Sequence, residues 1–162
     1  MPWAAFSDTM NNKNSSERTA RPMKISTKGI YALENITALA MHTGDGALDS
    51  IGSIARRRGL SVKYSERLSK ELKEQGLVVS IRGAHGGYCL GRDAGEITVR
   101  EVLQAEEGEL APVECLTKET DCGIDCNTCA TREIWSQIWQ IILDTAQEVT
   151  IGDIIEKSKN LR

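Results

Sequence analysis

Residues 50–90, SIGSIARRRGLSVKYSERLSKELKEQGLVVSIRGAHGGYCL, contain the pattern that decides the fold. Ser50 can cap a short helix over 51–58, whose isoleucines and alanine recur at helical spacing. Residues 59–61, Gly-Leu-Ser, predict a tight turn, and a second helix is expected over 62–75. Two short helices joined by a three-residue turn that contains glycine are the signature of a helix-turn-helix.

The second helix has an apolar side and a polar, mostly basic side. Val62, Leu68 and Leu72 are expected to point into the core. A recognition helix presents such a polar side to the major groove of DNA. The outer positions that we predict to contact DNA are Ser61, Lys63, Tyr64, Arg67 and Lys70.

A glycine-rich segment at 83–87 separates two apolar runs, LVVSIR at 77–82 and YCL at 88–90. This order predicts a β-hairpin with Arg82 at its tip. Directly after a helix-turn-helix, such a hairpin is a wing that can lie along the DNA backbone or reach the minor groove. We expect Cys89, in the second strand, to be a core residue.

Charge is divided unevenly along a chain whose net charge is −3. Residues 50–92 carry nine lysines and arginines against three glutamates, whereas 93–148 carry thirteen acids against three basic residues. A basic block beside an acidic block predicts a polyanion-binding face on a neutralising body.

Arg56, Arg57 and Arg58 precede the turn and are predicted to contact phosphates, which affects affinity and salt sensitivity more than sequence choice. The alternative is a solvated helix face stabilised by pairs such as Lys70–Glu74. We disfavour it because the charges fall at the turn, the recognition helix and the hairpin tip, where a winged helix touches phosphate.

Further helices are expected outside this stretch, over 27–43, 98–104, 131–148 and 150–157. The first would be capped by Ser26 or Thr27 and broken by the glycines at 44–46, whereas Thr98 with Glu101 and Thr150 with Asp153 match the capping-box spacing. Apolar spacing predicts that the first helix turns inward Ile30, Leu33, Ile36 or Thr37, and Ala40 or Met41.

The helix over 131–148 has more apolar surface than a terminal helix needs. A two-fold dimer is the commonest way to cover such a surface, so we predict a homodimer. The stripe consists of Ile134, Ile138, Ile141 or Ile142, and Thr145, with Trp135 and Trp139 beside it.

Four of the five cysteines lie in 115–129, CLTKETDCGIDCNTC, with the spacing C-x6-C-x3-C-x2-C. Cysteines that serve a core are spread over helix or strand faces and are not gathered among Thr, Asp, Asn and Gly. Clustered thiolates in a polar loop are typical of an iron–sulfur or zinc site, and the residues alone leave both open. A metal-free thiol switch is a further alternative. The candidate ligands are Cys115, Cys122, Cys126 and Cys129.

Composition limits the class of protein further. The chain has 162 residues and 40% hydrophobic content, which suits one core with a small extension, and no apolar run could span a bilayer. Without a secretory signal and with an odd number of cysteines, we expect a cytoplasmic location. No nucleophile–base pair, phosphate loop or hydrolase histidine motif is present, so we expect no enzyme and no small-molecule substrate.

The segments ISTKGIYAL, SIGSIARRRGLSVKYSERLSKELKEQGLV and SIRGAHGGYCLGRDAGEITVREVL, with the cysteines and TREIW, resemble the Rrf-two family of bacterial winged-helix regulators. Within that family, the IscR-like iron–sulfur branch is most similar. The resemblance runs from Met23 to Glu156. It implies a homodimer on near-palindromic double-stranded promoter DNA, paired by the long helix, with a cluster that modulates DNA affinity.

By position, the resemblance implies that Lys63, Glu66 and Arg67 meet bases and that Arg82 enters the minor groove. It also implies that Cys115, Cys122 and Cys129 hold a 2Fe-2S cluster; nitric-oxide-sensing relatives can hold 4Fe-4S.

Two departures concern the cluster ligands. Each gap between the three cysteines is one residue longer than in IscR-like members, and Arg132 stands where they have a histidine ligand. Cys126 is an additional thiol. The fourth ligand would then be Cys126, Asp125 or a carboxylate of the partner subunit.

The sequence therefore predicts a mainly α-helical protein with a small β-hairpin wing: a winged helix-turn-helix plus a long C-terminal dimerisation helix. Its expected function is a cluster-modulated transcriptional regulator, with a repressor favoured. Its rivals are a zinc-stabilised or thiol-switch regulator and a winged-helix protein-interaction module. The expected divisions are a disordered leader at 1–22, a DNA-binding domain at 23–104, a cysteine-rich loop at 105–130 and a dimerisation helix with a short final helix at 131–157.

Overall fold

The computed structural model describes residues 25–43, 47–83 and 85–161. The predicted leader at 1–22 and the glycines at 44–46 lie outside the described residues. The fold is mainly helical with one two-stranded antiparallel hairpin, as predicted. In chain order the elements are α1 (Thr27–Thr43), α2 (Ile51–Arg58), α3 (Val62–Glu74), β1 (Val78–Ile81), β2 (Gly87–Leu90), α4 (Val99–Glu107), the 3-10 turn η1 (Glu114–Leu116), α5 (Ala130–Glu148) and α6 (Ile151–Asn160).

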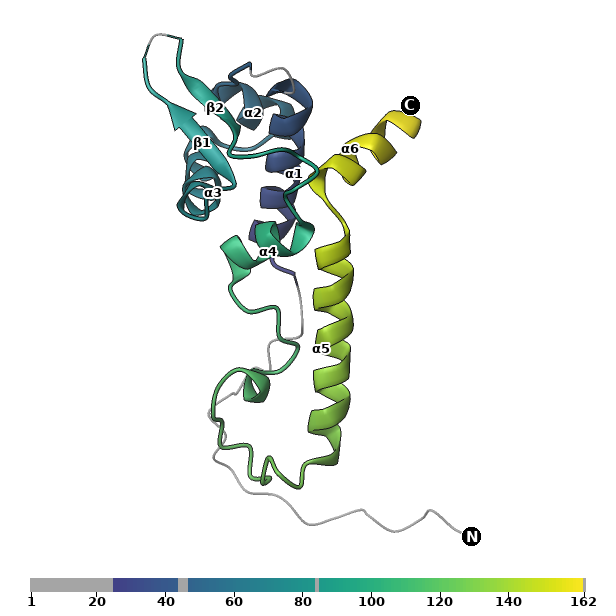
Figure 1. The fold of residues 1–162 in the computed structure, drawn as a ribbon. Coiled ribbons are helices and arrows are strands. Elements are labelled where there is room, and N and C mark those ends of the chain that lie inside the picture. The colour runs from purple at the N-terminus through teal and green to yellow at the C-terminus, as the bar shows by residue number, and fades with distance from the viewer. Residues whose placement is uncertain (1–24, 44–46, 84, 162) are drawn as a thin grey trace.

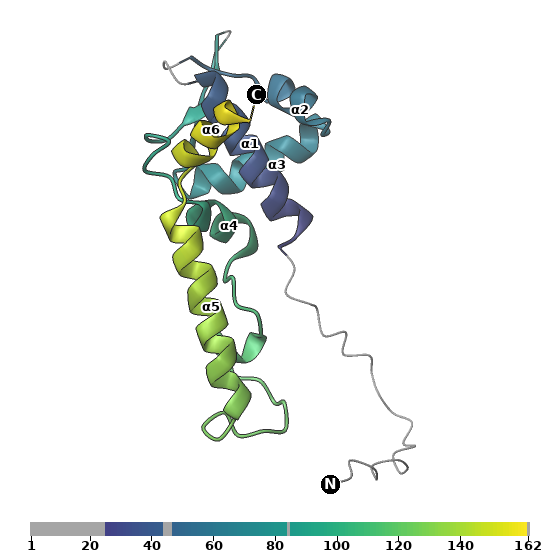
Figure 2. The same cartoon turned by 90° about the vertical axis from the view of Figure 1, so that its right-hand side faces the viewer.

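The molecule has a rounded head and a long protruding helix (Figure 1). We call residues 25–107, which hold α1 to α4 and the hairpin, the head; α6 packs against α1. With 19 residues, α5 extends for about 28 Å at 1.5 Å per residue. Both views place the loop before α5 at the end of the molecule away from the wing (Figures 1 and 2). The four cysteines at 115–129 are thus near the head in sequence and remote from the wing in space.

The helix-turn-helix forms as the sequence predicts. The Ser50 and Ser61 hydroxyls accept hydrogen bonds from backbone N–H groups three residues on, which begins α2 and α3. Gly59 ends α2 with φ 65°, a left-handed conformation that favours glycine. One prediction is wrong: Val62 is 47% exposed, whereas Leu68 and Leu72 enter the core as expected.

The buried face of α1 agrees with the predicted one except at its first position. Ile36 and Ala40 are buried as expected and Leu33 is half-buried, but Ile30 is 46% exposed. The buried face includes small and polar residues that a search for apolar spacing passes over, because α3 and α4 approach α1 closely there. These residues are Gly29, Ala32, Asn35 and Thr43.

The wing is fastened to the rest of the head through residue 49. Asp49 N donates to Tyr88 O at 2.9 Å, and Tyr88 N donates to Asp49 O at 2.8 Å. In the hairpin, Val79 pairs with Cys89 on the outer face, and Val79 is exposed. The prediction that Cys89 is a core residue is therefore wrong: strand alternation turns it to the half-buried outer side.

The helices α4 and α6 begin at the two predicted capping boxes, at Thr98 and Thr150. Helix α4 continues three residues beyond the predicted end at 104. Its start is joined to the α5–α6 junction, because Val99 N donates to Val149 O at 2.8 Å. None of the described helices is long and apolar enough to cross a membrane.

Helix α5 buries only its head-proximal end, through Leu143 and Ala146. On the predicted stripe, Ile134 is 54% exposed and Ile141 is 65% exposed. Ile138 is half-buried. The described chain therefore leaves this stripe largely uncovered.

Candidate nucleic-acid interface and cysteine segment

The outer face of α3 presents the predicted DNA-contacting side chains to solvent. Lys63, Glu66, Arg67 and Lys70 are exposed. Ser61 is exposed too, but its hydroxyl already accepts a hydrogen bond from Tyr64 N at 3.2 Å, so its clearest role is to cap α3.

Tyr64 links this face to the core instead of standing free on the surface. It is half-buried, and its ring meets that of Tyr31 on α1 edge to face, with centroids 6.0 Å apart. The guanidinium carbon of Arg67 lies 5.3 Å from the Tyr64 ring centroid. This cation–π contact orients Arg67 while its outer edge remains available to a base or phosphate.

The three arginines of α2 are not equivalent. Arg57 donates to the Asp49 carboxylate and, at 2.7 Å, to Ser53 Oγ. Arg58 forms an ion pair with Glu34 on α1. Arg56 is exposed, and no ion pair involving it occurs within the described ranges. Arg56 therefore has the most freedom to contact a phosphate, whereas the charges of Arg57 and Arg58 are partly compensated within the chain.

The wing places Arg82 just beyond the end of β1, where it is exposed. Helix α3 holds strand β1, which precedes Arg82, because Lys73 Nζ of α3 donates to Ser80 Oγ of β1 at 2.7 Å. The Lys70–Glu74 pair does form, with 3.5 Å between Nζ and Oε1, but both side chains are well exposed. Such a pair contributes little to stability and can open when a phosphate competes.

The four cysteines at 115–129 form two pairs that differ in exposure. Cys115 lies in η1 and Cys129 is the N-cap residue of α5, both half-buried, whereas Cys122 and Cys126 are exposed between them. No three His, Cys, Asp or Glu side chains in the described ranges are gathered as a metal site. The thiol set suits a thiophilic metal or cluster chemically, but ligation would require the exposed part of residues 115–129, here called the cysteine segment, to fold inward.

Arg132 closes the base of the cysteine segment. Its guanidinium donates to the backbone oxygen of Cys115, and η1 packs against α5. Arg132, which stands where the resemblance places a histidine in IscR-like members, is thus a structural link between the two ends of the segment.

The Cys129 thiol has a distinct environment. Its Sγ lies 3.4 Å from Thr131 Oγ1, and this hydrogen bond, followed by that of the Arg132 backbone N–H, lowers the pKa of Cys129. A lowered pKa favours the thiolate form of the side chain, which is the form that binds a metal.

Several residues that position this face carry no motif that sequence reasoning could use. Asp49 holds both Arg57 and the wing, and Tyr31 and Glu34 on α1 hold Tyr64 and Arg58. Only their tertiary partners reveal them.

A helix-turn-helix followed by a hairpin, with an exposed basic face over α2, α3 and the wing, defines a winged-helix DNA-binding protein. Residues 25–157 match the model of the Rrf2 (Rrf-two) family, described as an iron-dependent transcriptional regulator. The chain belongs to the Rrf2 family.

The relatives include regulators with different names. The HTH-type transcriptional regulator CymR of Bacillus subtilis is 39% identical over 132 residues, covering 82% of this chain and 89% of CymR. IscR of Xenorhabdus nematophila is 33% identical over 139 residues, covering 86% of this chain and 83% of IscR. The solved structure of T. potens IscR superposes with a TM-score of 0.70 at 32% identity and covers 86% of this chain and 90% of that one.

The match to the Rrf2 family model and the superposition on T. potens IscR confirm the predicted fold class and the predicted resemblance. The chain is a DNA-binding transcriptional regulator and not an enzyme, as expected. The relatives include both CymR and IscR, so membership of the family does not by itself assign an iron–sulfur cluster.

Proposed function

We propose that this protein is a cytoplasmic, homodimeric repressor of promoter DNA whose affinity is modulated by an iron–sulfur cluster in the cysteine segment. The observation that carries the proposal is the combination of an exposed basic winged-helix face with four thiols on a segment closed at its base by Arg132. Neither a membrane nor a small-molecule substrate is required.

DNA recognition would use α3 in the major groove. Lys63, Glu66 and Arg67 face outward from its first turns, where base edges are reached. Arg82 would enter the minor groove or follow the backbone. Arg56 would contact phosphate directly, and Ser61, Tyr64 and Lys70 would complete the surface with Arg57 and Arg58.

The cluster would be held by Cys115, Cys122 and Cys129, with Cys126 as the fourth ligand. The resemblance favours a 2Fe-2S cluster, and 4Fe-4S is the other form that this family chemistry allows. Such a group, when bound, supplies a centre that responds to oxidants, nitric oxide or cluster supply. Arg132 keeps the two ends of the cysteine segment together, so that drawing in the exposed thiols would alter the chain between α4 and α5.

Anaerobic purification tests the cluster directly. Iron, sulfide and zinc are measured per chain, together with the visible absorption spectrum. We expect a coloured protein with iron and acid-labile sulfide. A colourless protein with stoichiometric zinc would refute the cluster and support the zinc-stabilised alternative.

A metal-free thiol switch is the second candidate, because CymR is among the relatives and the solved B. subtilis protein is titled a global cysteine regulator. Duplexes selected by the protein from a random library provide a DNA probe for both candidates. If oxidation of the metal-free protein changes affinity for the selected duplex and Cys→Ser variants do not respond, the switch is supported. Failure to select any sequence would favour the protein-interaction module.

The homodimer is proposed on the stripe of α5. Ile134 and Ile141 remain exposed beside half-buried Ile138, and a two-fold pairing of α5 would cover all of them. Pairing would also give two winged-helix heads with fixed spacing, which near-palindromic DNA requires.

A further inference from the structure

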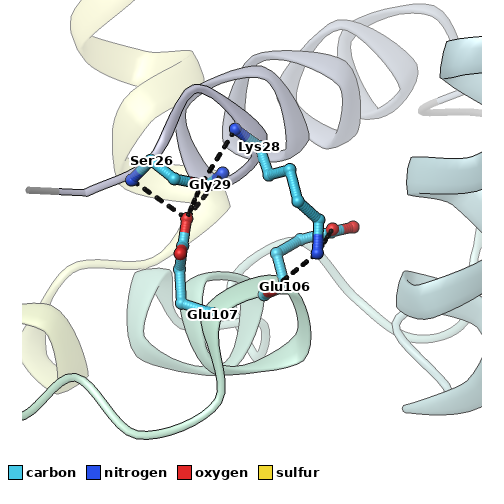
Figure 3. A network of polar contacts seen from close by, with 5 residues as sticks. All are labelled: Ser26, Lys28, Gly29, Glu106 and Glu107. Atoms are coloured by element: carbon cyan, nitrogen blue, oxygen red, sulfur yellow. Dashed lines mark hydrogen bonds and ion pairs between the residues drawn. The ribbon is translucent and has the colours of Figure 1, made fainter. Parts of the chain in front are cut away.

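The start of α1 and the end of α4 are fastened together by a network of polar contacts (Figure 3). Glu107 Oε1 accepts hydrogen bonds from Ser26 N at 3.1 Å and from Gly29 N at 3.0 Å, and also from the Ser26 hydroxyl. The free N–H groups at the start of a helix are usually capped by a neighbouring residue. Here the Ser26 hydroxyl accepts from Lys28 N at 3.1 Å, and a carboxylate about 80 positions further along the chain caps Ser26 N and Gly29 N.

Lys28 completes the network in the opposite direction. Its Nζ donates to the backbone oxygen of Glu106 at 2.8 Å and lies 3.3 Å from Glu106 Oε2. A carboxylate therefore meets the positive end of α1, and an ammonium meets the negative end of α4. We call Ser26, Lys28, Gly29, Glu106 and Glu107 the α1–α4 clamp.

Gly29 is required for this approach. A Cβ at this position would lie 2.7 Å from Glu107 Oε1 and 3.2 Å from Leu103 Cδ2. Any side chain at residue 29 would therefore displace the carboxylate or move α4 away from α1.

The clamp lies between the cysteine segment and the DNA-reading face. On one side, Glu107 is the last residue of α4, and the chain continues through Gly108 toward the cysteines. On the other side, α1 carries Tyr31, which meets Tyr64 of α3, and Glu34, which pairs with Arg58 of α2. The same helix thus contacts the end of α4 and both helices of the helix-turn-helix.

We propose that Glu107 is a positioning residue for DNA recognition: through α1 it sets how α2 and α3 present their side chains to DNA. This proposal rests on the function proposed above and adds a route by which movement at the end of α4 reaches the recognition helix. The plain alternative is a tertiary cap that only stabilises the head. The two differ in what they predict for the folded protein's choice between specific and nonspecific DNA.

The test uses the full chain and two duplexes of equal length, one selected by the wild-type protein from a random library and one with that sequence shuffled. Dissociation constants and the active fraction are measured by fluorescence anisotropy. Glu107→Ala is expected to bind the selected duplex at least about fivefold more weakly, with binding to the shuffled duplex and the active fraction unchanged. Gly29→Ala should reproduce this loss from the other side of the contact.

Two matched variants serve as controls. Glu107→Gln keeps an oxygen acceptor for the backbone N–H groups and should retain wild-type affinity. Glu109→Gln alters an exposed carboxylate two residues further on and should also have no effect. If Glu107→Ala cannot be purified, Lys28→Gln loosens the clamp through a partly exposed side chain, and a smaller loss of the same kind is expected.

A double-mutant cycle with Tyr31→Leu tests the route. If α1 transmits the effect of Glu107 on DNA affinity, the double variant Glu107→Ala/Tyr31→Leu binds the selected duplex no more weakly than whichever single variant has the lower affinity. Additive losses would overturn the route through α1. The clamp would be only a stabilising cap if both Glu107→Ala and Gly29→Ala distinguish the selected from the shuffled duplex as well as the wild-type protein does. The same conclusion would follow if these variants lost only active fraction and no affinity.

Failure of the proposed sensing is seen separately. If the wild-type protein binds the selected duplex equally in cluster-loaded and metal-free forms, cluster sensing is refuted, while the comparison of Glu107→Ala with Glu109→Gln still decides the role of Glu107. If a difference exists, it should shrink in Glu107→Ala.

Discussion

Glu106 is a buried carboxylate whose Oε2 lies 3.3 Å from the Lys28 ammonium, and its oxygens accept no other hydrogen bond among the described residues. Burial raises the pKa of Glu106; the nearby ammonium of Lys28 opposes this rise, whereas the carboxylates of Glu71 and Glu107 add to it. Because the folded-state pKa is above the unfolded one, the protonated form favours folding. This stabilisation is fully present below the unfolded pKa and is lost as pH rises through the folded pKa.

We therefore predict that Glu106→Gln stabilises the protein by roughly 1 kcal/mol near pH 7 and has almost no effect near pH 4. Urea unfolding of both proteins across this range measures the difference. Glu109→Gln, at an exposed position, should show no such trend. A difference that is constant with pH would contradict the assignment to Glu106.

At the cysteine segment, the residue-scale prediction concerns the fourth ligand. Cys126→Ala should change the visible and electron paramagnetic resonance spectra of the anaerobically purified protein, because one thiolate of the proposed shell is lost. Cys89→Ala, on the outer face of the wing, should leave both spectra unchanged. An unaltered spectrum in Cys126→Ala would make Asp125 or a partner carboxylate the better candidate.

At the scale of single elements, α3 and the wing act as one surface. The contact of Lys73 with Ser80 and the bridge between Asp49 and Tyr88 hold the hairpin relative to the recognition helix. Arg67 is oriented by the Tyr64 ring, and Arg82 extends from the wing. A rigid arrangement of this kind would reduce the ordering of the backbone that the proposed DNA binding by these two arginines requires.

Arg67→Ala and Arg82→Ala are each expected to weaken binding to the selected duplex by about 1–3 kcal/mol and to relax its sequence preference. Arg56→Ala should weaken selected and shuffled duplexes alike and reduce the salt dependence by about one counterion. Anisotropy titrations at several salt concentrations distinguish the two behaviours. Lys159→Ala, at an exposed position of α6, is the control. Unchanged binding in both Arg67→Ala and Arg82→Ala would contradict this docking.

At the scale of the whole molecule, α5 holds the cysteine segment away from the head. The first residue of α4 is hydrogen-bonded to Val149, which follows α5, and the last residue of α4, Glu107, is hydrogen-bonded to the start of α1. In the chain, the cysteine segment lies between α4 and α5. A conformational change in the cysteine segment would therefore be transmitted along the chain in two directions. One leads through the end of α4 into the α1–α4 clamp, and the other leads along α5 into the proposed dimer stripe.

Ile141→Glu is predicted to convert the dimer into a monomer, since it places a charge at the most exposed isoleucine of the stripe. Sedimentation velocity measures the change, and thermal unfolding at low concentration should show a head that is still folded. Ser136→Glu lies on another side of α5, about 200° around the helix from Ile134, and should remain dimeric. A monomeric wild-type protein would exclude this interface.

The sequence by itself determined where α2, α3, α4 and α6 begin, the helix-turn-helix and the wing, because these depend on partners a few residues apart. Ser50, Ser61, Thr98 and Thr150 each cap a helix through the backbone N–H three positions on. It also identified the basic face and the thiol-rich segment, since both are local concentrations of one chemistry.

Only the tertiary structure decided which faces are buried and which distant residues meet. The burial of Asn35 instead of Ile30, the outward position of Cys89 and the separation of the cysteine segment from the wing depend on how the elements pack. The contact of Glu107 with Ser26 and Gly29 joins residues about 80 positions apart, and no local pattern encodes such a pairing. It arises because packing α4 on α1 brings a helix end with unpaired N–H groups against a carboxylate, where a buried polar group must find a partner.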